Sequence, residues 1–377
     1  MKARGFVEEI KKIGINTFIG VPDSTLKYFC NYLNKKDDKE IQHYVPVNEG
    51  AAVGMAVGNY LITQEPACVY MQNSGIGNVV NPITSLANTE VYGIPMLMII
   101  GWRGEPGQKD EPQHKFMGKI TKDVLDILGI EYAIMGKDTK IETIKNEFKR
   151  ARCVMDNNCQ FAFIVKRDFF DEEGSVSFEN NYNMIREEAI KEIISSISEK
   201  DIVISTTGKI SREVYEQSDL IKGQHAQDFL TVGGMGHSSM IALGIAEKER
   251  NKRIYCLDGD GALIMHMGSL AFIGKQKPSN LIHICFNNDA HESVGGMPTG
   301  CVGKEYASIA KSCGYTNTYV VDNLHELQNV LSKVREEKQL SFIEVKVAMK
   351  SRLDLGRPKE SAEENKVNFM KYHGGNI

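Results

Sequence analysis

Short apolar runs alternate with helix-like segments along the whole chain, and this alternation limits the fold more than any other feature. Each run has five to seven residues, is mostly apolar and is bounded by turn-forming residues, which is typical of strands buried in a parallel sheet. Strands that alternate with helices predict the α/β class, with doubly wound parallel sheets. The predicted strands lie at 17–21, 42–47, 67–72, 96–101, 131–135, 161–166, 201–206, 227–232, 253–258, 281–286, 317–321 and 341–347.

The alternation is interrupted once, by the acidic segment DFFDEEGSVSFENNYN at 168–183. This segment contains Gly, Ser and Asn and has no hydrophobic period, as expected of a linker. The alternation then restarts with the amphipathic segment REEAIKEIISSI. We therefore expect two domains of similar pattern, at 1–170 and 185–377, joined by a linker at 171–184. The polar residues at the C-terminus are predicted to form a tail of the second domain.

The charge balance and the cysteines exclude several classes of protein. With 45 basic and 49 acidic residues the formal net charge is −4, which argues against a nucleic-acid partner. The most apolar stretch, YGIPMLMIIGW, is too short to span a membrane, so no membrane partner is expected. The eight cysteines form no CxxC motif and the N-terminus has no apolar signal region. These features favour a reducing, cytoplasmic location.

Two short motifs at the ends of neighbouring strands predict a metal site. The strand at 253–258 runs into Gly259, Asp260 and Gly261, and the next strand ends at Asn287 and Asn288, after 25 intervening residues. One helix and one strand fit this spacing, so Asp260 and the Asn pair should meet at the same sheet edge. Carboxylate and amide oxygens suit Mg²⁺, which takes further ligands from phosphates. Each motif alone is more often an ordinary turn or helix cap, but the two at this spacing predict a metal–diphosphate site.

Two other glycine-rich segments fit a dinucleotide loop poorly. GGMGHSS (233–239) and GIGNVV (75–80) both lack the third glycine that such a loop requires, because Ser239 and Val80 stand there. A nicotinamide-dependent dehydrogenase is therefore a poor second interpretation.

The GDG motif and the Asn pair resemble the fingerprint of the thiamine diphosphate-dependent decarboxylases. The resemblance implies that Asp260, Asn288 and the backbone of Ala290 hold Mg²⁺ against the diphosphate of thiamine diphosphate. It also implies two domains of the thiamine diphosphate-binding fold, one for the pyrimidine and one for the diphosphate, without the middle domain of larger members. The implied diphosphate contacts are Thr206, Thr207, Gly208, Gly259, Gly261 and Ala262.

The resemblance also assigns roles around the two rings of the cofactor. Glu49 would hydrogen-bond the aminopyrimidine, the Gly233 carbonyl would accept from its amino group, Met235 would support the bent cofactor, and His291 would approach it. Each of these residues also has an ordinary structural interpretation when it is taken alone. Glu49 would then be a residue of the first turn of a helix, Met235 a core residue, and residues 206–208 a helix cap. In the family, Glu49 and the diphosphate site come from different subunits, which implies a homodimer or higher homo-oligomer with active sites at the interface.

Three longer segments narrow the choice of substrate. GVPDS (20–24), RGEPGQKDEPQH (103–114) and NNDAHESVGGMPT (287–299) resemble a small two-domain group within the family. They imply decarboxylation of the 2-oxoacid 3-phosphonopyruvate to phosphonoacetaldehyde and CO₂ in phosphonate biosynthesis, with sulfopyruvate as the alternative substrate. A non-catalytic thiamine diphosphate-binding subunit is the alternative of another class.

The same resemblance implies how substrate and protons are handled. Asp23 and His114 would move protons, and Ser24 and His114 would contact the substrate. As plain alternatives, Asp23 and Ser24 form a helix N-cap and His114 is a loop residue. The phosphonate needs a cation or N–H donors, and the sequence does not choose among Arg103, Lys109, Lys115 and Lys209.

Overall fold

The structure is a computed structural model that describes residues 1–35, 38–172 and 178–374. The chain divides into two compact units. Unit 1 comprises Met1–Phe178 and His291–Gly300, and unit 2 comprises Glu179–Ala290 and Cys301–Ile377. Residues 173–177 of the predicted linker lie outside the described part of the chain.

Unit 1 is built on a six-stranded, fully parallel sheet in the order β2-β1-β3-β4-β6-β5. Alternate residues of β3 point to opposite faces of the sheet and pack in different hydrophobic cores. Cys68 and Tyr70 lie in one core, and Val69 and Met71 lie in the other. Both faces of the sheet are therefore buried, which explains the continuous apolar runs. The strands are β1 (Thr17–Gly20), β2 (Gln42–Tyr44), β3 (Ala67–Gln72), β4 (Met96–Gly101), β5 (Glu131–Met135) and β6 (Gln160–Val165).

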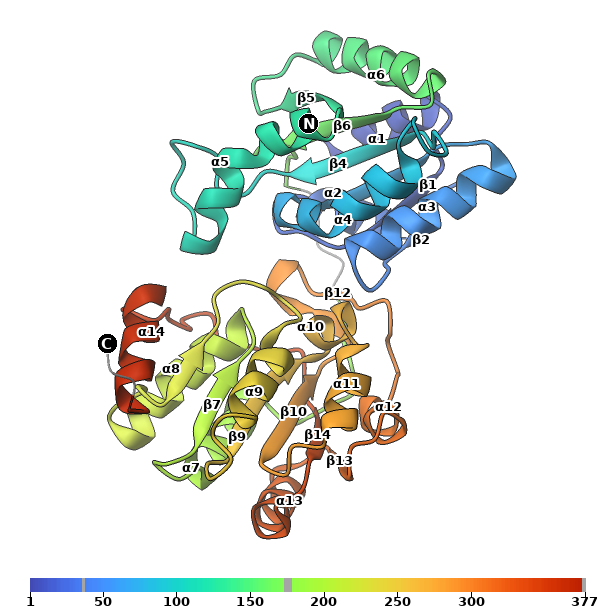
Figure 1. Ribbon diagram of the computed structural model, residues 1–377. Coiled ribbons are helices and arrows are strands. Elements are labelled where there is room, and N and C mark those ends of the chain that lie inside the picture. The colour runs from blue at the N-terminus through green and yellow to red at the C-terminus, as the bar shows by residue number, and fades with distance from the viewer. Residues whose placement is uncertain (36–37, 173–177, 375–377) are drawn as a thin grey trace. The chain divides into compact units, whose positions relative to one another are not determined.

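Helices cover both faces of this sheet (Figure 1). α1 (Ala3–Lys12), α2 (Lys27–Asn34) and α6 (Ile141–Asp156) pack on one face, around a cluster of phenylalanine rings. α3 (Glu49–Thr63), α4 (Ile76–Pro82) and α5 (Pro112–Ile127) pack on the other face. The doubly wound α/β class predicted from the sequence is confirmed in this unit.

Unit 2 repeats the same topology with unrelated local sequence. Its parallel sheet has the order β13-β14-β10-β9-β7-β8. Numbered by appearance within each unit, both sheets read 2-1-3-4-6-5 from one edge to the other. The strands are β7 (Ile202–Ser205), β8 (Asp228–Leu230), β9 (Ile254–Gly259), β10 (Leu281–Asn287), β13 (Asn317–Val321) and β14 (Ser341–Lys346). The doubly wound prediction therefore holds for both halves of the chain.

The helices of unit 2 also lie on two faces (Figure 1). One face carries α7 (Arg186–Ser196), α8 (Lys209–Lys222) and α13 (Leu324–Glu337), which enclose the core of the unit. The other carries α9 (Ser238–Ala246), α11 (Ser269–Gln276) and α12 (Tyr306–Ser312), with the short α10 (Asp260–Met265) directly after β9. β11 (Ala290–His291) and β12 (Met297–Pro298) form a separate two-stranded ribbon.

The chain reverses its direction of travel across each sheet between the first and third strands. This point lies between β1 and β3 in unit 1 and between β7 and β9 in unit 2. Ligands of open parallel sheets bind in the crevice outside the carboxyl ends of the strands at such a point. The loops that follow β1, β3, β7 and β9 are therefore the first places to look for a site.

The polar C-terminus forms a helix on unit 2 and so differs from the predicted tail. α14 (Ala362–Tyr372) begins with a capping box between Ser361 and Glu364. Its Asn365 side chain accepts from the Leu230 amide at 3.0 Å and donates to the Asp228 carbonyl at 3.0 Å. The helix therefore satisfies backbone groups of the edge strand β8, which would otherwise be open to pairing with another chain.

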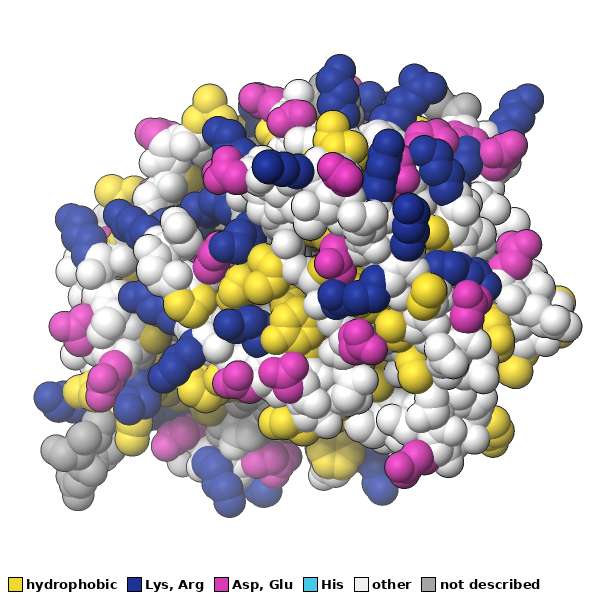
Figure 2. All heavy atoms as spheres, turned by 90° about the horizontal axis from the view of Figure 1, so that it is seen from above, with side chains coloured by type: hydrophobic (Ala, Val, Ile, Leu, Met, Phe, Trp, Pro, Cys, Tyr) yellow, Lys and Arg dark blue, Asp and Glu magenta, His cyan; other side chains and the backbone are white. Residues whose placement is uncertain are grey.

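The surface carries charges of both signs. On the face that Figure 2 shows, Lys and Arg side chains are interspersed with Asp and Glu side chains, so no basic field covers that face. In the part of the chain that the structure describes, no helix combines the length and the apolar character that crossing a membrane requires.

Candidate active site

Asp260 lies at the carboxyl end of β9, as the sequence predicted. Its Oδ1 accepts a hydrogen bond from the Gly261 amide at 2.8 Å, whereas the buried Oδ2 has no partner among the described residues. Burial, helped by the nearby charge of Asp289 and opposed by the Gly261 amide, raises the pKa of Asp260 to about 7. A cation bound to Oδ2 would offset this cost of burial.

The Asn pair follows the neighbouring strand at the same edge. Phe286 of β10 pairs with Gly259 of β9, so Asn287 and Asn288 project beside Asp260. The Asn287 side chain donates to Glu344 Oε1 at 2.8 Å and accepts from the Asp289 amide at 3.0 Å. Its partner Asn288 accepts from the Ala290 amide at 3.1 Å through Oδ1. Asn287 thus fixes the loop, and the Asn288 side chain and the Ala290 carbonyl provide oxygen atoms of the kind that bind a metal ion.

Asp289 holds the loop in a strained conformation. Its φ is +60°, the left-handed region that few residues other than glycine adopt. Two bonds stabilise it there: the Tyr182 hydroxyl donates to Oδ2 at 3.0 Å, and the Gly303 amide donates to Oδ1 at 3.0 Å. Strain held by such over-determined contacts is typical of functional loops.

The loops after β7 and β8 complete this edge of unit 2. Thr206 Oγ1 is buried without a partner among the described residues, and Gly208 has a φ of +99° just before α8. Thr207 Oγ1 donates to the Val232 carbonyl at 2.8 Å, which ties the two loops together. Gly233 and Met235 are only half-buried. Met235 is therefore not an ordinary core residue.

These groups fit a magnesium ion and a diphosphate. Asp260, Asn288 and the Ala290 carbonyl are hard oxygen donors of low total charge, which leaves coordination positions for phosphate oxygens and water. The unpartnered atoms of Asp260 and Thr206 are buried polar groups that require a partner. Ala262, in the first turn of α10, is 4% exposed and leaves room for backbone approach.

The buried side chain of Glu49 is held in place by neighbouring residues of unit 1. It is the first residue of α3, after the N-cap Asn48, and is 5% exposed. Asn78 donates to its Oε2 at 2.7 Å. A Cβ on Gly75 would lie 2.5 Å from its Oε1, so any larger residue there would displace this carboxylate. The sequence analysis missed Asn78 and Gly75; the available signal was the segment QNSGIGN directly after β3.

Asp23 lies at the carboxyl end of β1 and is fully buried. Its Oδ2 accepts from the amides of Thr25 at 2.9 Å and Leu26 at 3.2 Å, and its Oδ1 accepts from Gln72 Nε2 at 2.6 Å. Gln72 ends β3, so the bond bridges the reversal point of the sheet. Gln72 is a third residue that the sequence analysis missed. Asp23 is not the N-cap of α2, because that position belongs to Leu26 and has no side-chain cap bond. The Asp23 bonds to Thr25 and Leu26 instead hold the loop before the helix, and the carboxylate also has a partner on another strand.

His114 lies near Asp23, in the first turn of α5. It is half-buried, and its pKa is lowered by burial and by the charge of Arg103, against the opposing charges of Asp110 and Asp23. A neutral imidazole next to a buried carboxylate can accept a proton and, once protonated, donate it again. His291 is 8% exposed, and burial lowers its pKa to about 4.

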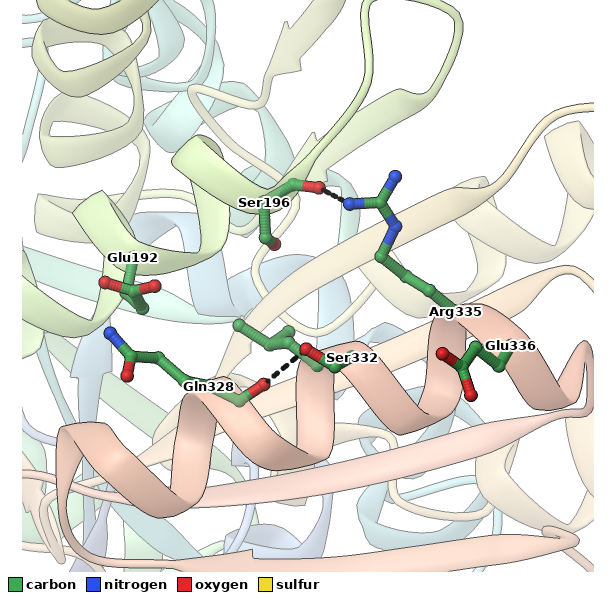
Figure 3. Close-up of a pocket in the computed structure, with 7 residues that line it drawn as sticks. Glu192, Ser196, Gln328, Ser332, Arg335 and Glu336 are labelled. Atoms are coloured by element: carbon green, nitrogen blue, oxygen red, sulfur yellow. Dashed lines mark hydrogen bonds between the residues drawn. The ribbon is translucent and has the colours of Figure 1, made fainter.

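Two other features of unit 2 contain none of the predicted site residues. A pocket between α7 and α13 contains the Arg335–Ser196 and Ser332–Gln328 hydrogen bonds (Figure 3). These segments precede β7 and β14, so the pocket lies at the amino edge of the sheet. A buried group of Cys256, Asp258 and His283 lies under the GDG loop. There Asp258 accepts from the Gly259 amide at 2.9 Å and contacts His283 Nε2 at 3.3 Å.

Two family models and several known decarboxylases match this chain. Residues 2–127 match the family model of the thiamine pyrophosphate enzyme N-terminal TPP binding domain, and residues 206–345 match that of the C-terminal TPP binding domain. A phosphonopyruvate decarboxylase of Streptomyces viridochromogenes is 30% identical over 98% of this chain and 94% of its own length. One of Streptomyces hygroscopicus is 30% identical over 96% of this chain and 91% of its own length.

Sulfopyruvate decarboxylases are also related. That of Methanosarcina acetivorans is 26% identical over 90% of this chain and 89% of its own length. The beta subunit of the enzyme of Methanocaldococcus jannaschii matches 42% of this chain at 33% identity, and 81% of its own length. By its two family domains and its end-to-end relatives, the chain belongs to the thiamine pyrophosphate enzyme family, in the branch that contains the phosphonopyruvate and sulfopyruvate decarboxylases.

Proposed function

We propose that the chain is a carboxy-lyase that uses thiamine diphosphate and Mg²⁺ to convert 3-phosphonopyruvate into phosphonoacetaldehyde and CO₂, in phosphonate biosynthesis. One observation carries the proposal. A single chain is similar from end to end to two phosphonopyruvate decarboxylases and contains both halves of the candidate site, Glu49 in unit 1 and Asp260 with Asn288 in unit 2.

The residues of unit 2 would hold the cofactor. Bound thiamine diphosphate supplies an electron sink for the electron pair that remains when a 2-oxoacid loses CO₂. Asp260, Asn288 and the Ala290 carbonyl would bind Mg²⁺, and Met235 and the Gly233 carbonyl would orient the ring system. The diphosphate would lie on Thr206, Thr207, Gly208, Gly259, Gly261 and Ala262. The unpartnered atoms of Asp260 and Thr206 support this assignment.

Glu49 would hold or release a proton at a pyrimidine nitrogen. Asn78 fixes its Oε2, and the bare backbone of Gly75 supports the other oxygen. A carboxyl group held in one place by packing is suited to proton transfer, because its geometry costs no reorganisation. His291 would approach the cofactor from the loop after the Asn pair.

Asp23 and His114 would handle protons at the substrate end of unit 1. Three donors hold the Asp23 carboxylate rigid. His114 is neutral near pH 7, because its pKa is lowered by burial and by Arg103. It could therefore accept a proton during the reaction and then, as the imidazolium, return it to the reacting carbon skeleton while Ser24 contacts the substrate.

The working form would be a cytoplasmic homodimer or higher homo-oligomer, with Glu49 of one subunit facing the diphosphate site of another. The exposed apolar residues Leu61 and Ile62 of α3, which are 64% and 86% exposed, support an interface on the Glu49 helix. The eight free cysteines support a reducing compartment.

Sulfopyruvate is the second candidate substrate, because a single-chain sulfopyruvate decarboxylase is 26% identical over 90% of this chain. The deciding experiment incubates the purified full chain, thiamine diphosphate and Mg²⁺ with phosphonopyruvate, sulfopyruvate or pyruvate, and measures CO₂ and aldehyde. We expect steady turnover of phosphonopyruvate that stops on chelation of Mg²⁺. Cofactor binding without CO₂ release from any of the three acids would instead indicate a non-catalytic subunit.

A further inference from the structure

Arg103 is placed differently from the other basic residues that could hold a phosphonate. Lys109 and Lys115 are exposed, and Lys209 begins α8 in unit 2. Arg103 follows β4 at the carboxyl edge of the unit 1 sheet, and its side chain is only 16% exposed. It is therefore a partly desolvated cation at the edge where Asp23 and His114 also lie.

Asp110 fixes the plane of the Arg103 guanidinium. Nε donates to Asp110 Oδ2 at 2.8 Å, and one terminal nitrogen donates to Oδ1 at 2.5 Å. The amides of Gly104 and Glu111, each at 2.8 Å, hold the Asp110 carboxylate in turn. Although burial opposes it, these bonds lower the pKa of Asp110 far below its usual range. The pair is therefore held in its charged form, and its hydrogen bonds fix its geometry.

The other terminal nitrogen of Arg103 donates to Ser24 Oγ at 2.8 Å. A guanidinium has five N–H donors, and the described contacts of Arg103 use three of them. One N–H on each terminal nitrogen remains, on a side chain that solvent can reach. Two fixed donors on one planar group match two oxygens of a phosphonate.

The Arg103–Asp110 pair would attract an anion through its directed N–H donors and not through a net positive charge. Asp110 balances the charge of Arg103, so the attraction depends on the directed N–H groups. The first turn of α5 begins at Pro112 beside this pair and contains no acidic residue, and a helix N-terminus favours an anion. The charges of Asp23 and of the N-cap residue Glu111 also act on Arg103 and oppose this effect. His114 lies in the same turn, and its lowered pKa favours the neutral imidazole, which does not repel the Arg103 guanidinium.

We propose that Arg103 is the residue that selects a 3-phosphono substituent on the substrate, with Ser24 beside it and Asp110 as the positioning residue that holds its guanidinium. The inference rests on the proposed function. Pyruvate lacks the substituent, so its binding leaves the two N–H donors without a partner, and a site built on polar contacts discriminates strongly against such an analogue.

The test compares kcat/KM for phosphonopyruvate with kcat/KM for pyruvate in the wild-type chain and in Arg103→Gln. We expect the variant to lose on the order of 100-fold on phosphonopyruvate, and no more than a few-fold on pyruvate. Lys109→Gln is the matched control, because it removes a charge from the same loop at an exposed position; its ratio should equal that of the wild type. Thermal unfolding and calorimetric affinity for thiamine diphosphate verify that each variant is folded.

Asp110→Asn tests the positioning role. It should raise KM for phosphonopyruvate about 10-fold, since a less ordered guanidinium binds worse, while kcat and the pyruvate parameters change little. A purely structural Asp110 would instead lower the unfolding temperature and affect both substrates equally, which contradicts the inference.

The outcomes separate the two proposals. If the wild-type chain prefers phosphonopyruvate and Arg103→Gln keeps the same preference, the Arg103 assignment is wrong and the proposed function stands. If the wild-type chain does not prefer phosphonopyruvate to pyruvate, the proposed function is wrong, and the Arg103 assignment is overturned with it.

Discussion

Asp260 is the residue on which cofactor binding depends most directly. Its buried Oδ2 has no partner among the described residues, and burial raises its pKa to about 7. Asp260→Asn keeps the size of the side chain but removes the charge that would bridge Mg²⁺ to the diphosphate. We expect the affinity for thiamine diphosphate in excess Mg²⁺ to fall by about 100-fold or more, measured by calorimetry.

A control for Asp260→Asn is available at the same sheet edge. Asp322 directly follows β13 and is exposed, so Asp322→Asn should leave the cofactor affinity unchanged. A cofactor affinity of Asp260→Asn close to that of the wild type would mean that another group holds the metal.

Asp228 gives unit 2 a characteristic dependence on pH. Burial raises its folded pKa to about 7 from 3.8, and Ser218 and the charge of Lys222 oppose the rise only in part. The unfolded chain therefore ionises first as the pH rises, so the free energy of unfolding decreases from about pH 4 to pH 7. The total loss is up to about 4 kcal/mol.

Urea unfolding of the wild type and of Asp228→Asn at several pH values between 5 and 7.5 measures this effect. The wild type should lose stability toward pH 7.5, whereas the variant should show a flatter profile. Parallel profiles for the two proteins would show that Asp228 is not the titrating group.

At the scale of elements, the segment between β3 and α4 supports the position of Glu49. A Cβ on Gly75 would meet the Glu49 carboxylate at 2.5 Å, although the φ of −70° at this glycine suits any residue. Gly75→Ala should therefore displace Glu49 and lower kcat on the order of 100-fold, the scale of a lost general acid–base partner. The calorimetric affinity for thiamine diphosphate should remain near that of the wild type, since the diphosphate would bind unit 2.

Gly77→Ala is the matched control for this element. Gly77 lies two residues further along, and a Cβ there meets nothing within 4 Å. It should keep full activity. Equal activities of the two alanine variants would remove the support for a precisely held Glu49.

The inner strands were predictable from sequence because each is a short apolar run whose two faces are both buried, and the partly exposed edge strand β5 is still a short, mostly apolar run. The runs at 67–72, 96–101 and 131–135 match β3, β4 and β5 without any shift of boundary. The C-terminal helix was not predicted, because α14 has few buried residues and depends on its capping box and on Asn365. Hydrophobic period alone does not detect a helix stabilised in this way.

The site was predictable only where a motif stands at the end of a strand. Asp260 and Asn288 meet because their strands are neighbours in the sheet. The supporting contacts of the site depend on side-chain directions in loops. They are the pairs Gln72 with Asp23, Asn78 with Glu49, and Arg103 with Asp110. Such hydrogen bonds between loop side chains leave no periodic signal in the sequence, so these supporting residues required the structure.

At the scale of the whole molecule, one chain carries two sheets of identical topology, and each bears one part of the candidate site at its carboxyl edge. If the active site joins Glu49 of one subunit to Asp260 of another, two inactive variants should complement each other. A mixture of Glu49→Gln and Asp260→Asn, after subunit exchange, should regain about one quarter of the wild-type activity, because half of randomly paired dimers contain one intact site.

The control for this experiment is each variant exchanged with itself, which should remain inactive. A mixture that stays inactive after verified subunit exchange would place Glu49 and Asp260 of one site on the same chain and would contradict the interface arrangement.

The central claim is the substrate, and internal competition tests it most directly. Equal concentrations of phosphonopyruvate and sulfopyruvate are supplied together to the wild-type chain with thiamine diphosphate and Mg²⁺, and the two aldehydes are quantified at low conversion, which gives the ratio of kcat/KM values. The account predicts an excess of phosphonoacetaldehyde, because two fixed N–H donors of Arg103 hold a phosphonate dianion more strongly than a singly charged sulfonate. An excess of sulfoacetaldehyde would contradict it.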